Sequence, residues 1–332
     1  MSVSVLLLLD HSGLSAYDSI FEIVNRIGRM TDVSLHLATS FNTKNYNFFN
    51  GNSDELVTVD VRDPFNFENR NEYFKTTNQK RLADFQLVFI RLDPPLDNQF
   101  LSHLKRYEDQ VRFINSPGGM QETATKAFLT HFSHLIPGFA VCKTKESMIA
   151  EAQKGGDHVF KPLYGLGGKG LVAIRDKAIW DGPDVVDADL ESEKFADIAD
   201  KTVPAVRMDF LPNIDQGDKR IVVFNGVVLG ALLRLPAQGG WLANLAQGGT
   251  VVPAEVSDVE HQMIKEIDPK LQERGIYLYG IDTLMGNDGH RVLSEINTAN
   301  VGGLVQISKF SDRDLWQTFE DEVSKIIDKS QR

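Results

Sequence analysis

The sequence predicts a mixed fold of α/β and α+β character, with an open parallel sheet in the first part of the chain and antiparallel sheets in the second. Near the N-terminus an apolar run at 3–9, apolar residues at helical spacing over 20–27 and a second apolar run at 33–38 follow one another. Strand, helix and strand at this spacing indicate a right-handed parallel unit. Further along, Asn-Gly at 225–226 and Gly-Asn-Asp-Gly at 286–289 each join two apolar runs, which is the sequence signal of a β-hairpin.

The other elements are expected in order along the chain. The parallel pattern continues with strands at 87–90 and 111–114, and Ser116-Pro117-Gly118 then breaks it. The remaining predicted elements are helices at 97–107, 120–132, 188–201, 257–274 and 312–328, strands at 158–162 and 170–175, and hairpin strands at 277–285 and 291–297. We therefore expect three parts: an N-terminal α/β domain over 1–120, a small subdomain with a glycine-rich flap over 121–202, and a C-terminal subdomain over 203–332.

Composition excludes several classes of protein. The formal net charge of −11 over 332 residues argues against a nucleic-acid binder, which needs clustered Lys and Arg. The single cysteine, Cys142, excludes an internal disulfide framework and a thiolate metal cluster. The run at 3–9 is too short for a signal sequence or a membrane span, and no other segment is longer and apolar throughout. We expect a cytoplasmic protein that acts on small molecules, with no nucleic-acid or membrane partner.

A glycine-rich stretch, VFKPLYGLGGKG at 159–170, matches the G-x-G-x-x-G pattern. A dinucleotide site requires a helix after the glycines, whereas the following Leu-Val-Ala-Ile is typical of a strand. Two strands joined by such a loop can form a flap whose backbone N–H groups bind phosphate oxygens, with Lys161 adding a charge. The alternative is a plain glycine turn with Lys161 in solvent.

Acidic and amide side chains converge on the second hairpin. Glu295 and Asn297 are two residues apart, so both side chains leave the same face of the sheet, and the hairpin brings Asp282 beside them. Oxygen ligands of this kind suit Mg²⁺ bound together with nucleotide phosphates. The alternative is the solvent-facing side of an antiparallel sheet.

Three arginines and a long loop complete the pattern. Arg91 ends an apolar strand, the position at which open α/β sheets bind ligands, and Arg220 and Arg234 lie on the first hairpin. Arginine is suited to binding carboxylates and phosphates. The glycine-rich loop at 236–249 is typical of a mobile lid.

Together these segments resemble a known family. The order FKPLYGLGGKG, MDFLPN, GDKRIVVFNG, RLPAQGG…NLAQGG, GIDTL and SEINTAN resembles the ATP-grasp superfamily, and most closely the bacterial glutathione synthetases. FIRLDPPLD and FINSPGGMQETATKAFL agree with this, so that the resemblance extends over about residues 1–325. It implies an ATP-grasp fold preceded by the open parallel-sheet domain.

The resemblance also implies roles for individual residues. Those that would contact ATP are Lys126, Lys161, Gly165, Leu166, Gly167, Gly168, Gly170, Asp209, Phe210, Leu211 and Asp218. Asp209, Phe210 and Leu211 would form the hinge beside adenine, and Asp218 would approach the ribose. Those that would bind the substrates are Arg91, Arg220, Arg234, Asn244 and Thr298, of which Arg220, Arg234 and Asn244 would be catalytic. Asp282, Glu295 and Asn297 would hold one or two Mg²⁺ ions, with Mn²⁺ as an alternative.

The implied reaction is the ligation of a carboxylate to an amine. The γ-phosphoryl group of ATP is transferred to a carboxylate, and an amine displaces phosphate from the resulting acyl phosphate. In glutathione synthesis the two substrates are γ-glutamylcysteine and glycine. Related enzymes are often dimers or tetramers, so the resemblance also implies a homo-oligomer.

Two segments depart from the family pattern. Where the family commonly has V-T-S-P-T after Glu-Ile-Asn, this chain has Thr-Ala-Asn-Val-Gly-Gly at 298–303. Where the lid of the family carries a basic residue, as in G-E-T-R-G-N, this chain reads Gly-Trp-Leu-Ala-Asn at 240–244 and lacks the arginine. These departures leave a ligase for another amine or acid as the main alternative to glutathione synthesis. The further alternatives are a non-catalytic ATP sensor and, last because a strand follows the glycines, a dinucleotide-dependent oxidoreductase.

Overall fold

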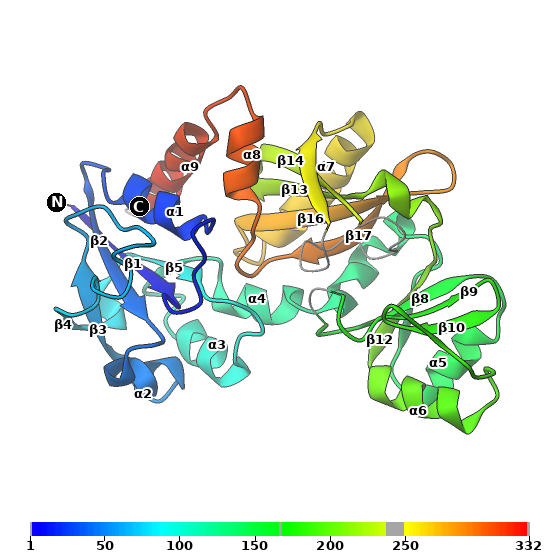
Figure 1. Cartoon of the computed structure of the whole chain (residues 1–332). Helices are drawn as coiled ribbons and strands as arrows, with labels where there is room; N and C mark the ends of the chain where they lie inside the picture. Colours follow the sequence, from blue (N-terminus) through cyan, green and yellow to red (C-terminus); the bar gives the residue numbers. More distant parts are fainter. Residues whose placement is uncertain (1, 166–167, 237–248, 331–332) are drawn as a thin grey trace.

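The computed structural model describes residues 2–165, 168–236 and 249–330, which form three sheets (Figure 1). The first sheet lies at the N-terminal end of the molecule, the second in the small subdomain at the opposite end, and the third between them. Along the chain, the strands of the first sheet are followed by those of the second and then by those of the third. The C-terminal helix then returns to the first sheet.

The first sheet has the strand order β4-β3-β2-β1-β5-β6. Its parallel strands are β1 (Val3–Leu9), β2 (Val33–Thr39), β5 (Leu87–Arg91) and β6 (Arg112–Ile114). Two antiparallel strands, β3 (Glu55–Asp60) and β4 (Asn78–Arg81), extend the edge beyond the predicted parallel sheet. The helices of this part are α1 (Ile20–Ile27), η1 (Thr43–Asn45), α2 (Tyr46–Phe49), η2 (Leu82–Asp84) and α3 (Asn98–Lys105).

The predicted helix at 120–132 is wrong in its extent, because two shorter helices replace it. These are α4 (Pro117–Thr123) and the 3-10 helix η3 (Lys126–Leu135). The Ser116 hydroxyl caps α4 and Pro117 occupies its first turn, so the helix begins earlier than the apolar pattern suggests. Thr125 has an extended backbone and caps η3, which ends the continuous helix.

The second sheet has the strand order β11-β10-β9-β8-β12-β7. Its strands are β7 (Ala140–Cys142), β8 (His158–Pro162), β9 (Val172–Arg175), β10 (Ala178–Asp181), β11 (Asp184–Val186) and β12 (Ala205–Asp209), with helices α5 (Lys145–Ala152) and α6 (Glu193–Thr202). β8 and β9 are antiparallel on either side of the glycine-rich stretch, so the predicted order of strand, glycine loop and strand is confirmed.

The third sheet has the order β15-β14-β13-β16-β17 and is antiparallel throughout. Its strands are β13 (Asp218–Phe224), β14 (Val227–Leu235), β15 (Thr250–Ala254), β16 (Leu278–Met285) and β17 (Arg291–Asn297). Asn225 and Gly226 both have positive φ, as a tight two-residue hairpin requires, and the predicted hairpin is confirmed. The other helices are η4 (Asn213–Gln216), α7 (Asp258–Gln272), α8 (Leu304–Phe310) and α9 (Leu315–Ser330).

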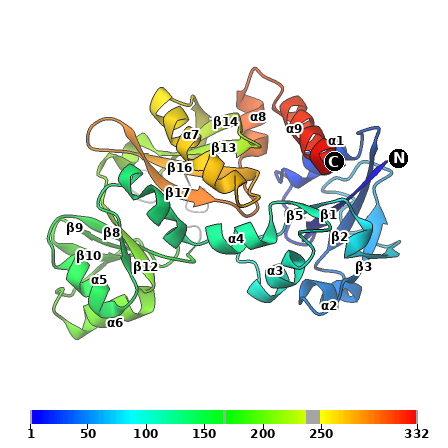
Figure 2. The same ribbon diagram turned by 180° about the vertical axis from the view of Figure 1, so that it is seen from behind.

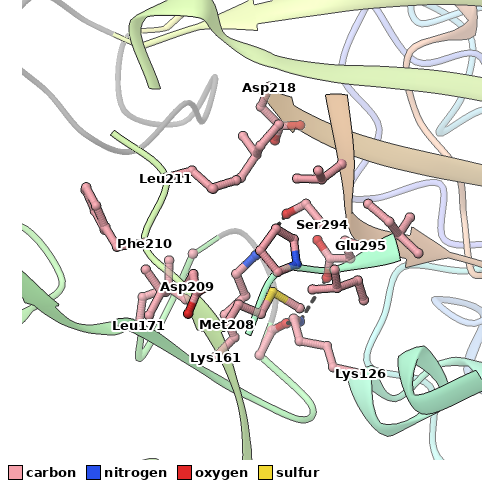
Figure 3. A pocket seen from close by; sticks show the side chains of 18 of the residues that line it. Lys126, Lys161, Leu171, Met208, Asp209, Phe210, Leu211, Asp218, Ser294 and Glu295 are labelled. Atoms are coloured by element: carbon pink, nitrogen blue, oxygen red, sulfur yellow. Dashed lines mark hydrogen bonds and ion pairs between the residues drawn. The ribbon is translucent and has the colours of Figure 1, made fainter. Parts of the chain in front are cut away.

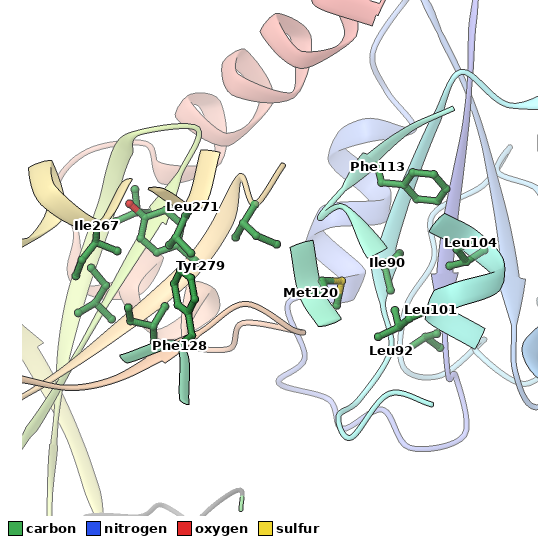
Figure 4. Close-up of a cluster of buried hydrophobic side chains, with 14 of the residues drawn as sticks. Ile90, Leu92, Leu101, Leu104, Phe113, Met120, Phe128, Ile267, Leu271 and Tyr279 are labelled. Carbon is green, nitrogen blue, oxygen red and sulfur yellow. The ribbon is translucent and has the colours of Figure 1, made fainter. Parts of the chain in front are cut away.

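The first and third sheets are joined by shared apolar cores. Figure 4 shows Met120 of α4 beside the buried side chains of the first sheet, while Tyr279 and Leu271 lie in the part of the same cluster under the third sheet. Figure 2 shows α4 between α3 and the third sheet. On α9, the ring of Phe319 lies 4.8 Å from Phe224 of β13 and 6.3 Å from Phe89 of β5. Among the described residues no helix is long and apolar enough to cross a membrane.

Candidate active site

A pocket lies between the second and third sheets (Figure 3). One part of its wall is apolar and contains Ile136, Val159, Leu171, Met208, Phe210, Leu211, Leu284, Val292 and Leu293. The other part is polar and contains Lys126, Lys161, Lys169, Asp218, Ser294 and Glu295. An apolar slot that leads to clustered cations suits a planar base with a polyanionic tail.

The two predicted phosphate-binding lysines point into this pocket. Lys126 Nζ lies 2.8 Å from Glu295 Oε1 and donates to the Gly165 carbonyl at 2.5 Å. Lys161 Nζ donates to Ser294 Oγ at 2.9 Å. Burial lowers the pKa of Lys161, while nearby Glu295 opposes that shift. Both ammonium groups are therefore held beside oxygen partners at the polar end of the pocket.

Part of the predicted flap lines the same pocket. Gly165 and Gly168 belong to its wall, and Gly168 and Gly170 have positive φ, which glycine adopts without strain. Leu166 and Gly167 lie outside the described residues. The placement of Gly165 and Gly168 agrees with a loop that covers the lysines.

The predicted hinge residues Asp209, Phe210 and Leu211 also line the pocket. The backbone N–H of Asp209 donates to the Pro137 carbonyl at 3.0 Å, and that of Phe210 donates to Asp157 at 2.9 Å. The Asp209 carboxylate lies 3.0 Å from Arg207 Nη2. These two N–H groups are thus already paired inside the protein, so a base would meet other backbone groups of the hinge.

The acidic hairpin and two arginines form one ion-pair cluster. Asp282 is paired in register with Glu295, and Asn297 Nδ2 donates to Asp282 Oδ2 at 3.2 Å, as the hairpin prediction expects. Arg220 donates to both oxygens of Asp282 through Nε and, at 2.8 Å, through Nη2. Arg234 Nη2 lies 2.9 Å from Asp282 Oδ2. The arginines and the carboxylates that were predicted separately therefore contact each other.

Asp218 and Asp282 both pair with Arg234, but their pKa values are shifted in opposite directions. Arg234 Nη2 lies 2.7 Å from Asp218 Oδ2, while Asp218 Oδ1 is buried and has no hydrogen-bond partner among the described residues. Burial, with the neighbouring Asp282, raises the pKa of Asp218 to about 7. Burial also disfavours the charge of Asp282, but Arg220 and Arg234 outweigh it and hold the pKa of Asp282 well below its ordinary value. Asp218 thus brings an unpaired oxygen to the wall of the pocket.

Arg91 and Thr298, which were also predicted to bind the substrates, do not line this pocket. Arg91 is buried at the end of β5 and donates to the Val301 carbonyl at 3.3 Å and to Ser19 Oγ at 3.1 Å. Burial lowers the pKa of Arg91 to about 10, so its guanidinium remains charged at neutral pH. Thr298 is buried with its Oγ1 2.8 Å from Thr123 Oγ1, and Asn244 lies outside the described residues.

Besides the apolar wall, sequence reasoning missed two polar residues of the pocket, Ser294 and Lys169. In a regular strand, Ser294 would face away from Glu295. The pairing of β16 with β17 shifts between Asp282 and Thr283, and this bulge brings Ser294 into the pocket wall beside Glu295. Lys169 follows the flap glycines, so its position in the sequence was the available signal.

The second hairpin carries oxygen donors that suit a divalent cation. Among the described residues no three His, Cys, Asp or Glu side chains are grouped closely enough to bind a metal on their own. The predicted set has two carboxylates and the amide of Asn297, all hard oxygen donors of the kind that Mg²⁺ shares with phosphates. Their present partners are cations: Asp282 contacts Arg220 and Glu295 contacts Lys126. The donor chemistry therefore fits Mg²⁺ together with an anionic ligand that takes over those cations.

Comparisons with known proteins agree in both parts of the chain. The family model for the prokaryotic glutathione synthetase ATP-grasp domain matches residues 125–312, and the N-terminal domain model of the same family matches residues 20–121. Glutathione synthetase of Parasynechococcus marenigrum is 30% identical over 71% of this chain and 74% of its own length. That of Mesorhizobium japonicum is 29% identical over 73% of this chain and 74% of its own.

Solved structures show the same fold at low identity. D-cycloserine synthetase DcsG has a TM-score of 0.64 and 12% identity, over 97% of this chain and 99% of its own. D-alanyl-alanine synthetase A from Vibrio cholerae has a TM-score of 0.59 and 12% identity, over 99% of both chains. The predicted ATP-grasp fold is confirmed.

Proposed function

The chain belongs to the prokaryotic glutathione synthetase family and is an ATP-dependent ligase that acts on small molecules, and we propose that it joins γ-glutamylcysteine to glycine. The observation that carries this proposal is one continuous constellation. It begins at the apolar slot beside Asp209, Phe210 and Leu211 and passes the two lysines. It ends at the cluster of Asp282 with Arg220 and Arg234.

We assign the pocket to ATP, with adenine in the apolar part. The unpaired Oδ1 of Asp218 would accept a hydrogen bond from a ribose hydroxyl, which supports the predicted role of this residue. Lys126 and Lys161 would bind the phosphates from one side, and the flap N–H groups between Gly165 and Gly170 from the other.

Asp282, Glu295 and Asn297 would hold Mg²⁺, or Mn²⁺ in its place. When bound, the ion would neutralise phosphate charge during phosphoryl transfer. The triphosphate would at the same time take up the lysine and arginine cations that now pair with these carboxylates. This exchange of partners leaves no buried charge unpaired in the complex.

The chain's own residues would then orient the acceptor. Arg91, Arg220 and Arg234 would bind carboxylate and phosphoryl oxygens. Asn244 and Thr298 would also bind the substrates, as the resemblance to the family implies. The carboxylate oxygen attacks the γ-phosphorus as ADP leaves, and the amine nitrogen then attacks the acyl carbon as phosphate leaves. No protein nucleophile is required, and exclusion of water protects the acyl phosphate.

The test is ADP release with Mg-ATP, γ-glutamylcysteine and glycine, together with detection of the peptide product. Wild-type protein should release ADP only when both substrates are present. Glu295→Gln should lower turnover by at least about 100-fold, since it removes charge at the phosphate end of the pocket. Glu266→Gln, an exposed position on α7 paired with His134, is the matched control and should retain activity. An active Glu295→Gln enzyme would refute the metal assignment.

A second candidate is a ligase for a different amine or acid. The departure of residues 298–303 from the family pattern favours it, because this segment contacts Arg91 through Val301. ADP release with another pair of substrates, and none with glycine, would select this alternative. ATP binding without turnover on any pair would instead indicate a sensor.

We further propose that the enzyme is cytoplasmic, where ATP is available, and that it forms a homo-oligomer. Fractionation of the host cell would test the first statement, and light scattering of the purified chain the second. A monomer at working concentration would refute the oligomer.

A further inference from the structure

Asn115 holds the end of the third sheet to the end of the first. Its Nδ2 donates to the carbonyls of Leu278 at 2.6 Å and Thr298 at 2.7 Å. Its Oδ1 accepts from the N–H groups of Tyr277 at 2.8 Å and Leu278 at 2.9 Å. The residue is buried, and these four bonds use the full donor and acceptor capacity of its amide.

A second attachment lies at Val301, three residues after Thr298. Arg91 donates to the Val301 carbonyl at 3.3 Å, and Asn300 Nδ2 donates to Asp93 Oδ1. Residues 298–303, called the acceptor segment below, are thus held at Thr298, Asn300 and Val301 by Asn115, which follows β6, by Asp93 in the loop after β5 and by Arg91 of β5. Their backbone position depends on these side chains as well as on β17.

The acceptor segment also lies against Arg220. A Cβ built at Gly280 would be 2.9 Å from Arg220 Cδ and 3.1 Å from Val301 Cγ1, so both side chains pack over this glycine. A Cβ built at Gly303 would be 3.9 Å from Arg220 Cγ. The segment therefore runs between Arg91 and Arg220, two of the three arginines assigned to the acceptor, while none of the residues bonded to Asn115 lines the ATP pocket.

We propose that Asn115 is a positioning residue for the acceptor side of the active site. It sets the place of the acceptor segment between Arg91 and Arg220, and hence the fit of the peptide and the amine, without affecting ATP binding. The inference rests on the proposed function, in which these arginines bind the acceptor.

The first experiment is independent of activity. Amide hydrogen exchange would be measured for peptides that cover residues 298–303 in wild type, Asn115→Asp and Asn45→Asp. Asn45 is a matched control, because it is buried, donates to the Thr39 and Val57 carbonyls, and accepts from the Val57 N–H. We expect exchange of the acceptor segment to accelerate at least tenfold in Asn115→Asp alone. Unchanged exchange would overturn the proposal.

The second experiment separates the substrates by their KM values. Asn115→Asp should raise the KM for the peptide or the amine at least tenfold, while the KM for ATP changes less than threefold. Asn45→Asp should lower the thermal unfolding midpoint and leave all KM values unchanged. A positioning role would be refuted if Asn115→Asp raised the KM values for the peptide, the amine and ATP alike. It would also be refuted if the KM values of Asn115→Asp matched those of Asn45→Asp.

Both experiments remain decisive if the first variant does not fold or if the substrates differ from the proposed pair. If Asn115→Asp does not fold, Asn115→Ser removes the same two donors without adding a charge. If wild type turns over another pair of substrates, the proposed function fails and the KM comparison uses that pair. If it turns over none, the hydrogen-exchange result alone decides whether Asn115 holds the segment.

Discussion

At the scale of single residues, one arginine is the shared partner of two carboxylates in the site. Arg234 contacts both Asp218 and Asp282, and Arg220 binds Asp282 through two nitrogens. Glu295 pairs with Lys126, and Lys161 is a further cation of the pocket, whose ammonium donates to Ser294. If a metal and a polyanion bind here as proposed, the metal would take over the carboxylates and the polyanion the arginine and lysine cations, so each buried charge would keep a partner.

The single cysteine allows a prediction from its pKa. Cys142 is fully buried in β7, and burial raises the pKa of its thiol to about 11. At pH 8 only about one molecule in a thousand would carry the reactive thiolate. Native protein should therefore resist iodoacetamide at pH 8, whereas protein in denaturant should be labelled within minutes, as mass spectrometry would measure. Fast labelling of the native protein would mean that the β7 region opens.

At the scale of elements, a buried network on the back of the third sheet holds the strands that carry the site. Glu260, in the first turn of α7, accepts from Lys219 Nζ and from Thr283 Oγ1, each at 2.7 Å. Lys219 and Thr283 are register partners on β13 and β16, directly next to Arg220 and Asp282. Because neighbouring residues of a strand face opposite sides, Glu260 fixes from behind the register that lets Arg220 meet Asp282.

The flap loop gives a prediction at the same scale. Gly168 lines the pocket with φ of 76°, and alanine in that conformation costs about 1–2 kcal/mol. Gly168→Ala should therefore raise the KM for ATP by about tenfold if the strain is relieved by displacing the flap. Gly182→Ala is the control: its φ is 60°, nothing lies within 4 Å of the added Cβ, and it belongs to the turn between β10 and β11. Steady-state kinetics that show equal KM changes for both variants would contradict the assignment of the flap.

At the scale of the whole molecule, the sequence predicted those elements whose own residues determine their conformation. The Asn225-Gly226 turn requires positive φ at both residues, and the apolar run of β1 requires cover on both faces, so both could be read from the residues. β4 lacks such a signal: its four residues, Asn78–Arg81, are polar and mostly exposed. Edge strands of this kind are determined by their partner rather than by their own pattern.

The candidate site was predictable in its residues but less so in its contacts. The convergence of Asp282, Glu295 and Asn297 followed from the period of a strand. The turn of Ser294 into the pocket did not, because a bulge depends on pairing across the sheet. The pairing of Arg234 with Asp218 likewise needed the register of β13 with β14, which sequence spacing leaves open.

The joint between the first and third sheets supports the last prediction. In α4, a Cβ added at Gly119 would lie 2.0 Å from the backbone oxygen of Arg274, at the end of α7. A Cβ at the adjacent Gly118 meets only the flexible ends of Lys105 and Glu108, at 3.0 Å or more. Gly119→Ala should thus push α4 away from α7 and lower the unfolding free energy by about 1–3 kcal/mol. Gly118→Ala should be neutral or slightly stabilising, since alanine favours a helix.

Displacement of α4 should also reach the active site, because this helix connects the sheet that carries Arg91 to the sheet that carries Asp282. Gly119→Ala is therefore expected to raise the KM for the acceptor more than that for ATP, whose pocket lies between the second and third sheets. Thermal unfolding and steady-state kinetics on the two alanine variants measure both effects. If both variants had the same unfolding free energy and the same KM values, the backbone near Arg274 would accommodate the added methyl group without loss of stability. The joint would then not set the geometry of the acceptor site.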